Sequence, residues 1–283
     1  MHIIDYADLT PELARSGVFV TNMPNEAYHA YQGISNSGLK LVQQSPAHYA
    51  YRSDFNQTRN MEIGSAFHTA LLEPERYASE YMTLNGIKVR TASEYKQAAK
   101  IYGKDKTLTE QEGAAVAVMM ESVRSNPDAV PLFDEPGHAE LSAFIEDPET
   151  GVLMRCRYDW LTLTRHAIDI KKTQDCQHRA FERNAFNYGY HVQEAMYRHI
   201  FKLITGDDLE SFRFLAIEEQ PPCANILYRY DDLARQEAHK EYRAALLRYA
   251  EAEKTGDWVG YGIHSDVISL PEWKLNELDE EIY

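Results

Sequence analysis

The run from residue 152 to residue 173, VLMRCRYDWLTLTRHAIDIKKT, constrains the fold more than any other part of the chain. Residues 152–163 alternate and are rich in strand-forming types, and residues 166–173 repeat this character after a short turn, so we expect two neighbouring strands. These strands contain Asp159, Asp169 and Lys171, whose charges a sheet interior rarely accepts. Because side chains alternate across a strand, Asp169 and Lys171 should share one face, and Asp159 can reach the same region.

The rest of the chain predicts further strands and several helices around this pair. Residues 1–34 are loop-rich. We expect strands at 139–147, 212–220 and 224–230, and helices at 34–52, 61–77, 92–103, 108–126, about 177–187, 188–205 and 231–256. This order predicts an α/β fold with a central mixed β-sheet flanked by helices. Since no internal linker stands out, residues 1–283 are predicted to form one domain, helical at about 25–130 and with its sheet core at about 138–230.

Local signals support the ends of these helices. Ser35 or Ser37 can cap the helix at 34–52, and Pro46 interrupts it early. Gly256 closes the long last helix.

Composition argues against several classes of protein. The apolar runs are too short for a membrane span, and without a basic start and apolar stretch we expect no secretory signal and a cytoplasmic location. Three cysteines without a CxxC pair disfavour disulfides, a structural zinc site and an all-cysteine iron–sulfur cluster. A formal net charge of −15 argues against nucleic acid as a partner, but a metal-dependent nuclease needs clustered carboxylates, so the charge does not decide.

Two aspartates and a lysine in one region of a sheet suit metal-assisted hydrolysis of a phosphodiester. Carboxylate oxygens bind Mg²⁺ or Mn²⁺, the metal activates a water, and the lysine can orient that water or stabilise negative charge. The alternative is a solvated strand face, because Asp-x-Lys occurs by chance in most proteins of this length. The neighbouring candidate residues favour the chemical interpretation.

Four residues elsewhere could join this site. Glu140 could add a third carboxylate, or it is a solvated strand end. His68 can bind metal, although a lone histidine on an apolar helix is more often a core or surface residue, and Gly64 one turn earlier would allow close approach. Gln193 and Tyr197 share a helix face and can bind phosphate or hold the lysine, unless the helix is simply amphipathic.

The order of these residues resembles the PD-(D/E)XK nuclease superfamily, and within it the RecE-type exonucleases. The pattern is Gly64-x-x-x-His68, Asp159, Asp169-Ile170-Lys171, and Gln193 with Tyr197. Three more stretches resemble that family: YHAYQGISNSGLKLVQQSPAHYAYR, IGSAFHTALLEPERY and TGDWVGYGIHSDVISLPEW. The resemblance covers roughly residues 25–275. It departs from the motif only where Tyr158 replaces the proline and where Lys172 follows the lysine.

The resemblance implies a Mg²⁺-dependent exonuclease, with Mn²⁺ as a substitute, that digests one strand of linear duplex DNA from its 5′ end. The remaining 3′ strand would pass to a single-strand annealing recombinase, and the nuclease would form a homo-oligomeric ring. Its implied metal ligands are His68, Asp159, Asp169 and the main-chain carbonyl of Ile170. Lys171 would be the catalytic lysine, and Gln193 with Tyr197 would lie near the DNA.

Basic residues near this site are candidate DNA contacts, although each alone could be a solvated charge. They are Arg155, Arg157, Lys171, Lys172, Arg179 and Arg183, with Tyr49, Tyr51 and Arg52 as a patch further upstream.

Other functions remain open. The same fold could serve a structure-specific or restriction-type endonuclease, or a non-catalytic module that binds DNA ends or protein. A helicase–nuclease is disfavoured because the sequence has no G-x-x-x-x-G-K-[ST] loop. A glycosidase would use paired carboxylates but would leave Lys171, His68 and Gln193 unexplained.

Overall fold

The structure is a computed structural model that describes residues 1–53, 58–262, 267–272 and 274–275. Its centre is a seven-stranded mixed sheet with strand order β1-β2-β5-β6-β7-β8-β9. The strands are β1 (Ile3–Asp5), β2 (Val18–Thr21), β5 (Gly137–Glu146), β6 (Leu153–Thr162), β7 (His166–Thr173), β8 (Ser211–Glu218) and β9 (Asn225–Tyr228). Two pairs, β1–β2 and β7–β8, are parallel, and the other neighbours are antiparallel. A separate parallel pair is formed by β3 (Met82–Leu84) and β4 (Thr107–Thr109).

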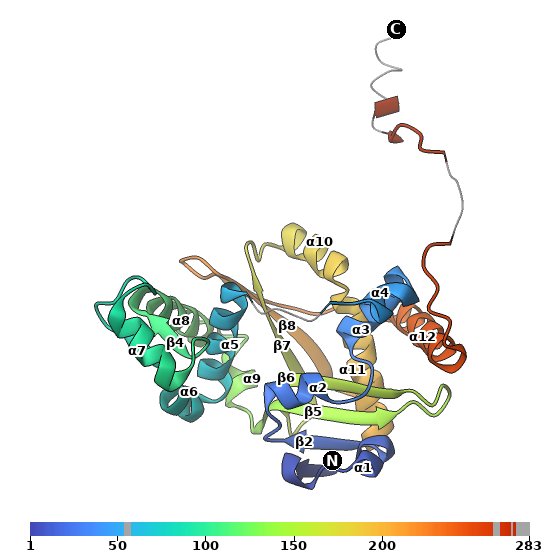
Figure 1. The fold of residues 1–283 in the computed structure, drawn as a ribbon, viewed down its shortest axis with the longest axis horizontal. Helices are drawn as coiled ribbons and strands as arrows, with labels where there is room; N and C mark the ends of the chain where they lie inside the picture. The colour runs from blue at the N-terminus through green and yellow to red at the C-terminus, as the bar shows by residue number, and fades with distance from the viewer. Residues whose placement is uncertain (54–57, 263–266, 273, 276–283) are drawn as a thin grey trace.

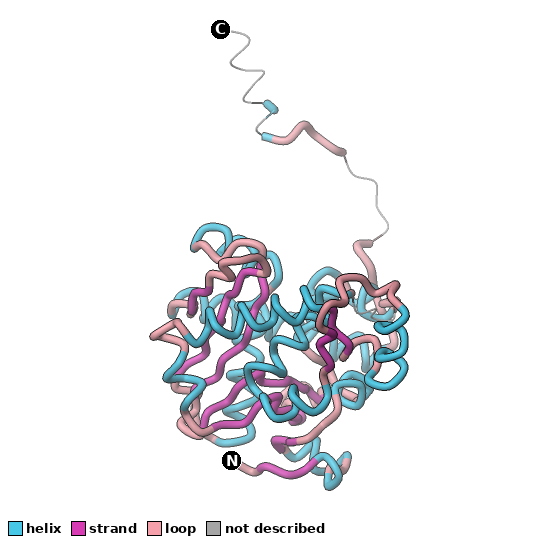
Figure 2. The backbone as a smooth tube through the Cα atoms, turned by 90° about the vertical axis from the view of Figure 1, so that its left-hand side faces the viewer, coloured by secondary structure: helices cyan, strands magenta, loops and turns pink. Residues whose placement is uncertain are grey.

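Helices lie on both sides of the sheet (Figure 1), and Figure 2 shows the strands running through a body that helices surround. The helices are a short 3₁₀ helix (Tyr6–Asp8), α1 (Pro11–Ser16), α2 (Asn25–Ala30), α3 (Asn36–Gln44), α4 (Pro46–Ala50), α5 (Arg59–Leu72), α6 (Pro74–Glu80), α7 (Ser93–Tyr102), α8 (Glu110–Arg124), α9 (Val130–Asp134), α10 (His178–Tyr188), α11 (Tyr190–Thr205) and α12 (Asp232–Thr255). One core joins the sheet to α3, α10, α11 and α12, and a second joins it to α5 and α8.

The connection between β7 and β8 positions the candidate site. Parallel neighbouring strands need a long crossover, and here α10 and α11 provide it. The side chains of Val192, Met196 and Ile200 are buried along α11 and join the core that includes β6 and β8. This packing holds the first turns of α11 against the sheet, close to the carboxylates of β7.

Local chemistry explains several helix ends. The Ser35 side chain accepts a hydrogen bond from the Gly38 N–H and caps α3, and α4 starts directly at Pro46. Thr109 and Glu112 form a reciprocal capping box at the start of α8. Gly256 ends α12 in a left-handed conformation, as the sequence predicts.

The predicted α/β fold with a central mixed sheet and flanking helices is confirmed. All five predicted strands are present, and Pro46 separates two helices as expected. The predicted helix at 61–77 is wrong at its end, because α5 stops at Leu72 and Pro74 begins α6. Within the described residues, no helix is long and apolar enough to cross a bilayer.

The expectation of a loop-rich segment at residues 1–34 is also wrong. It contains β1, β2, α1 and α2, and Val18, Phe19 and Val20 are fully buried. These elements have only three to six residues each, too few for a periodic pattern to stand out. The family-like stretch TGDWVGYGIHSDVISLPEW, residues 255–273, lies partly outside the described residues. The assignment of residues 1–283 to a single domain stays a prediction.

Candidate active site

The site forms where strands β6 and β7 stop pairing regularly. Trp160 pairs with Ile168 and Leu161 with Ala167 near the turn that joins the strands. Beyond that point the Ile170 N–H donates a hydrogen bond to Asp159 Oδ2, with the two atoms 2.7 Å apart. A side-chain carboxylate thus binds the main chain of the neighbouring strand and lies between the two strands.

Glu140 lies directly across from Asp159 on the neighbouring strand β5. The register is regular on either side, and Glu140 itself has a left-handed backbone with φ of +48°. Leu141 packs into the core with α11, whereas Ala139, two residues earlier, packs against the core with α5, so the alternation of faces breaks at Glu140. Such a conformation costs of order 1 kcal/mol or more and is often retained at functional sites, where it redirects a side chain.

Glu140, Asp159 and His68 lie close enough together to hold a metal ion. His68 Nδ1, from α5, lies 3.7 Å from Asp159 Oδ2 and 3.9 Å from Glu140 Oε1. One ligand atom from each residue lies within 4.8 Å of the others, and this is the one such group of three in the described part of the chain. Burial lowers the pKa of His68 to about 4, so at neutral pH its imidazole is neutral and can act as a ligand.

The carboxylates of this site repel one another. Burial, and then the charge of Asp159, raise the pKa of Glu140 to about 8. Burial is also the main cause that raises the pKa of Asp169 to about 6, and Asp159 adds to it. Buried like charges of this kind are relieved by a bound cation, and oxygen ligands with one imidazole suit a hard divalent ion. The residues present therefore fit a divalent metal.

Asp169 and Lys171 share one face of β7, as their spacing predicts. Lys171 Nζ lies 2.5 Å from Asp169 Oδ1, and the Asp169 side chain is almost fully buried. The other oxygen, Asp169 Oδ2, accepts a hydrogen bond from the side-chain amide of Gln193 on α11. Gln193 thus holds a candidate metal ligand, where the sequence suggested that it would hold the lysine or phosphate.

Two aromatic rings surround the Lys171 ammonium. Lys171 Nζ lies 4.6 Å from the centre of the Tyr190 ring and 6.0 Å from that of Phe214. Burial alone would lower the pKa of Lys171, but the charges of Asp169, Tyr190 and Asp159 and the hydrogen bond to Asp169 together outweigh it and raise that pKa, which keeps the ammonium protonated. Tyr190 was not predicted to be a site residue. Its place three residues before Gln193, on the same helix face, was the signal that could have found it.

Tyr197 lies in the core behind the site. It is 8% exposed, its carbonyl accepts a hydrogen bond from the Tyr158 hydroxyl at 2.7 Å, and its ring packs edge-on against Phe212. The two residues of the Gln-x-x-x-Tyr pair therefore have different roles. Gln193 reaches the site, and Tyr197 anchors α11 to β6. The implied position of Tyr197 near DNA does not agree with this burial.

Comparison with known proteins identifies the family. Residues 35–270 match a family described as a PDDEXK-like domain of unknown function. This chain belongs to that family. The expected membership of the PD-(D/E)XK superfamily is thereby confirmed, and the RecE-type subgroup stays a prediction.

A solved structure shares the fold of this PDDEXK-like domain. It is the crystal structure of a "putative exonuclease" from Eubacterium rectale, with a TM-score of 0.58 and 14% sequence identity over 81% of this chain and 87% of that chain. No curated protein matches the sequence significantly.

Arg155 and Arg157 of this PDDEXK-like domain hold its N-terminal segment and are poor candidates for DNA contacts. Arg155 donates hydrogen bonds to the carbonyls of Gly33 and Tyr28, at 3.0 and 2.5 Å. Arg157 is buried, and it donates to Ser142 Oγ and to a main-chain carbonyl in the 23–33 segment, both at 2.9 Å. These guanidinium groups are occupied within the fold.

Lys172 ties α5 to the sheet. It donates to the Asn60 carbonyl and lies 3.3 Å from a carboxylate oxygen of Glu219. Gly64 faces the same lysine, but a Cβ there would lie 3.7 Å from Lys172 Cε, an ordinary contact. Close approach therefore does not require glycine at this position.

Arg179 and Arg183 differ from the other basic candidates. Both are exposed on α10, and neither forms an ion pair with any residue that the structure describes. They stay candidate DNA contacts. Of the upstream patch, Arg52 lies over the Tyr49 ring at 4.0 Å, and Tyr51 is 86% exposed.

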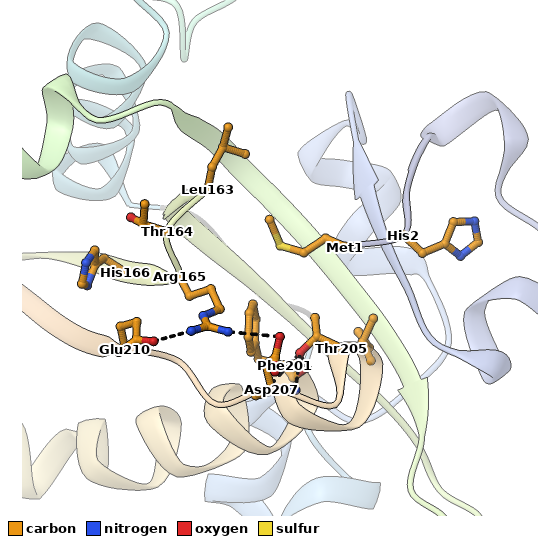
Figure 3. A pocket seen from close by; sticks show the side chains of 11 residues that line it. Met1, His2, Leu163, Thr164, Arg165, His166, Phe201, Thr205, Asp207 and Glu210 are labelled. Carbon is orange, nitrogen blue, oxygen red and sulfur yellow. Dashed lines mark hydrogen bonds and ion pairs between the residues drawn. The ribbon is translucent and has the colours of Figure 1, made fainter.

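A separate hollow lies at the other end of β7 (Figure 3). Its lining includes Met1, Leu163 and Arg165, and the Arg165 guanidinium is paired with Asp207 and Glu210. His166 of this lining precedes Asp169 by three residues, about 10 Å along a strand. This hollow is thus distinct from the candidate active site, and the guanidinium in its lining is already paired with two carboxylates.

Proposed function

We propose that this protein is a metal-dependent exodeoxyribonuclease that degrades one strand of linear duplex DNA from its 5′ end. The observation that carries the proposal is the arrangement of Asp159, Asp169 and Lys171 at the diverging strands, beside the His68–Glu140–Asp159 ligand set. Membership of the PDDEXK-like family supports a nuclease.

The residues of the site would divide the chemistry between them. Asp159, Asp169, Glu140 and His68 would hold Mg²⁺, or Mn²⁺ in its place, with the Ile170 carbonyl nearby. A divalent ion at such a site polarises the phosphate and lowers the pKa of a bound water. Lys171 carries its positive charge next to Asp169, where it can orient the attacking water and stabilise the charge that develops on the phosphate. Gln193 fixes the Asp169 carboxylate through its hydrogen bond.

Three finer parts of the proposal rest on the resemblance to RecE-type exonucleases. They are the 5′ to 3′ direction, transfer of the 3′ strand to an annealing recombinase, and assembly into a ring. The description of the Eubacterium rectale protein as an exonuclease is in keeping with action at DNA ends. A cytoplasmic location belongs to the same proposal.

The test uses two substrates of one sequence, a linear duplex labelled at one 5′ end and a covalently closed circle, each incubated with the protein and Mg²⁺. The expected result is release of the label as mononucleotides with the circle intact. Linearisation of the circle would replace the proposal with an endonuclease. No cleavage of either, with Mn²⁺ also tried, would point to a non-catalytic DNA-end-binding module.

A further inference from the structure

A large aromatic side chain stands exposed at the end of α10, next to the candidate active site. Tyr188 is the last residue of that helix, and 56% of its surface is exposed. Gly189 follows it with a left-handed backbone, which turns the chain sharply into α11. The ring thus lies at a helix junction with more than half of its surface open to solvent.

Tyr188 connects to the catalytic lysine through a second ring. Its ring is stacked on that of Tyr190, with centres 5.8 Å apart and planes inclined by 25°. The Tyr190 ring in turn lies 4.6 Å from Lys171 Nζ. The exposed Tyr188 ring is therefore one stacked ring away from the Tyr190 ring, which contacts the Lys171 ammonium. This spacing suits a base on Tyr188 that belongs to the nucleotide next to the phosphate at Lys171.

The positive charge beside Tyr188 suits a polyanion. Lys40 Nζ from α3 lies 5.2 Å from the centre of the Tyr188 ring. Arg179 and Arg183 are exposed one helical turn apart on α10, but they lie on the opposite face of that helix from Tyr188. Among the residues that the structure describes, Lys40 forms no ion pair, on a chain whose net charge is −15. Cations of this kind beside exposed rings are typical of surfaces that bind single-stranded nucleic acid.

We infer that Tyr188 is a stacking platform for an unpaired nucleobase, that of the nucleotide next to the scissile phosphate. The inference rests on the proposed function and adds the form of DNA that enters the site. Inside a duplex both faces of a base are covered by its neighbours, so an exposed tyrosine ring can stack only on a base that has left the helix or that ends it. Lys40 would bind the backbone of the same strand.

The test is a binding cycle between the tyrosine and the base. The probe is a duplex with a short unpaired 5′ end and a fluorophore on its 3′ end, titrated in Ca²⁺ so that binding is read with little cleavage. A single abasic residue is moved through the unpaired end and the first base pairs, and Kd is measured for the wild type and for Tyr188→Ala. Stacking on an aromatic side chain typically changes Kd by about 5- to 150-fold per base.

For the wild type, the abasic residue should weaken binding at one position of the probe. For Tyr188→Ala, the abasic residue at that position should not weaken binding further, because the ring that stacks on the base is already absent. Tyr188→Trp, which keeps a flat ring, should restore the wild-type profile. Tyr6→Ala removes a partly exposed tyrosine near the other edge of the sheet and should leave the profile unchanged.

If Kd depends on the position of the abasic residue in the same way for Tyr188→Ala and the wild type, Tyr188 is not a stacking platform. Cleavage of linear DNA in Mg²⁺, measured in parallel, separates this failure from that of the proposed function. If the wild type cleaves normally, only the platform is wrong. If the wild type neither binds nor cleaves the DNA, both are wrong.

Discussion

Replacing Glu140 by glutamine should stabilise the metal-free protein, although it removes a candidate metal ligand. Burial, and then the charge of Asp159, raise the pKa of Glu140 from 4.5 to about 8. An acid whose pKa is higher in the folded state contributes stability below its unfolded pKa and loses it as the pH rises through the folded pKa. The wild type should therefore lose this stability between pH 4.5 and about pH 8.

The size of the effect follows from the same shift. A rise in pKa from 4.5 to about 8 corresponds to roughly 5 kcal/mol for a fully buried carboxylate. The Glu140 side chain keeps 30% of its surface exposed, and Arg157 Nη1 lies 3.9 Å from its carboxylate. Solvent screening and the loss of the attraction to Arg157 therefore reduce the gain in the free energy of unfolding of Glu140→Gln to about 1–2 kcal/mol. For a chain of this size the melting temperature should rise by about 2–8 °C.

The assay is thermal unfolding in EDTA from about pH 5 to about pH 8.5, with Glu121→Gln as the control, since Glu121 is exposed on α8. The difference between Glu140→Gln and the wild type should be small at the acid end and grow with pH, while the control shows no such trend. Added Mn²⁺ should raise the melting temperature of the wild type more than that of the variant. A variant that is less stable than the wild type in EDTA at alkaline pH would refute the reasoning.

Three further predictions concern the basic and aromatic residues. Exchanging both Arg179 and Arg183 for glutamate should weaken DNA binding and flatten the plot of log K against log salt concentration by about two units, and an unchanged slope would remove both residues from the interface. Arg155→Ala should lower the free energy of unfolding by about 1–3 kcal/mol, measured by urea denaturation, because it leaves two partly buried carbonyls without their donor. It should leave the salt slope unaltered. Tyr190→Leu should lower kcat with little change in KM, whereas Tyr190→Phe should keep most of the rate because the ring that faces Lys171 remains; equal loss in both would assign the role to the hydroxyl.

The two strands that carry the candidate site could be predicted because their signal is local. Alternation along β7 places Asp169 and Lys171 on one face, and in the structure Lys171 Nζ lies 2.5 Å from Asp169 Oδ1. The partner of Gln193 could not be predicted in the same way. It depends on the α10–α11 crossover, which sets α11 against β7, and no short stretch of sequence encodes that packing.

Long-range packing also explains what the sequence misjudged. Arg155 and Arg157 alternate with Asp159, which favours a shared surface, but residues 23–33 fold over that face and take up both guanidinium groups. Glu140 could be predicted only as one of two alternatives, a third carboxylate or a solvated strand end. Its place in the site depends on its register with Asp159 and on a positive φ, and neither can be read from the sequence around it.

The central claim is that Lys171 and Asp169 perform hydrolysis. It is tested most directly by degradation of 5′-labelled linear duplex in Mg²⁺ by the wild type, Lys171→Ala and Asp169→Ala, with the fold of each checked by circular dichroism. We predict that the wild type releases the label and that both folded variants lose cleavage. If a folded Lys171→Ala protein cleaved the DNA as fast as the wild type does, that result would contradict the assignment of this site.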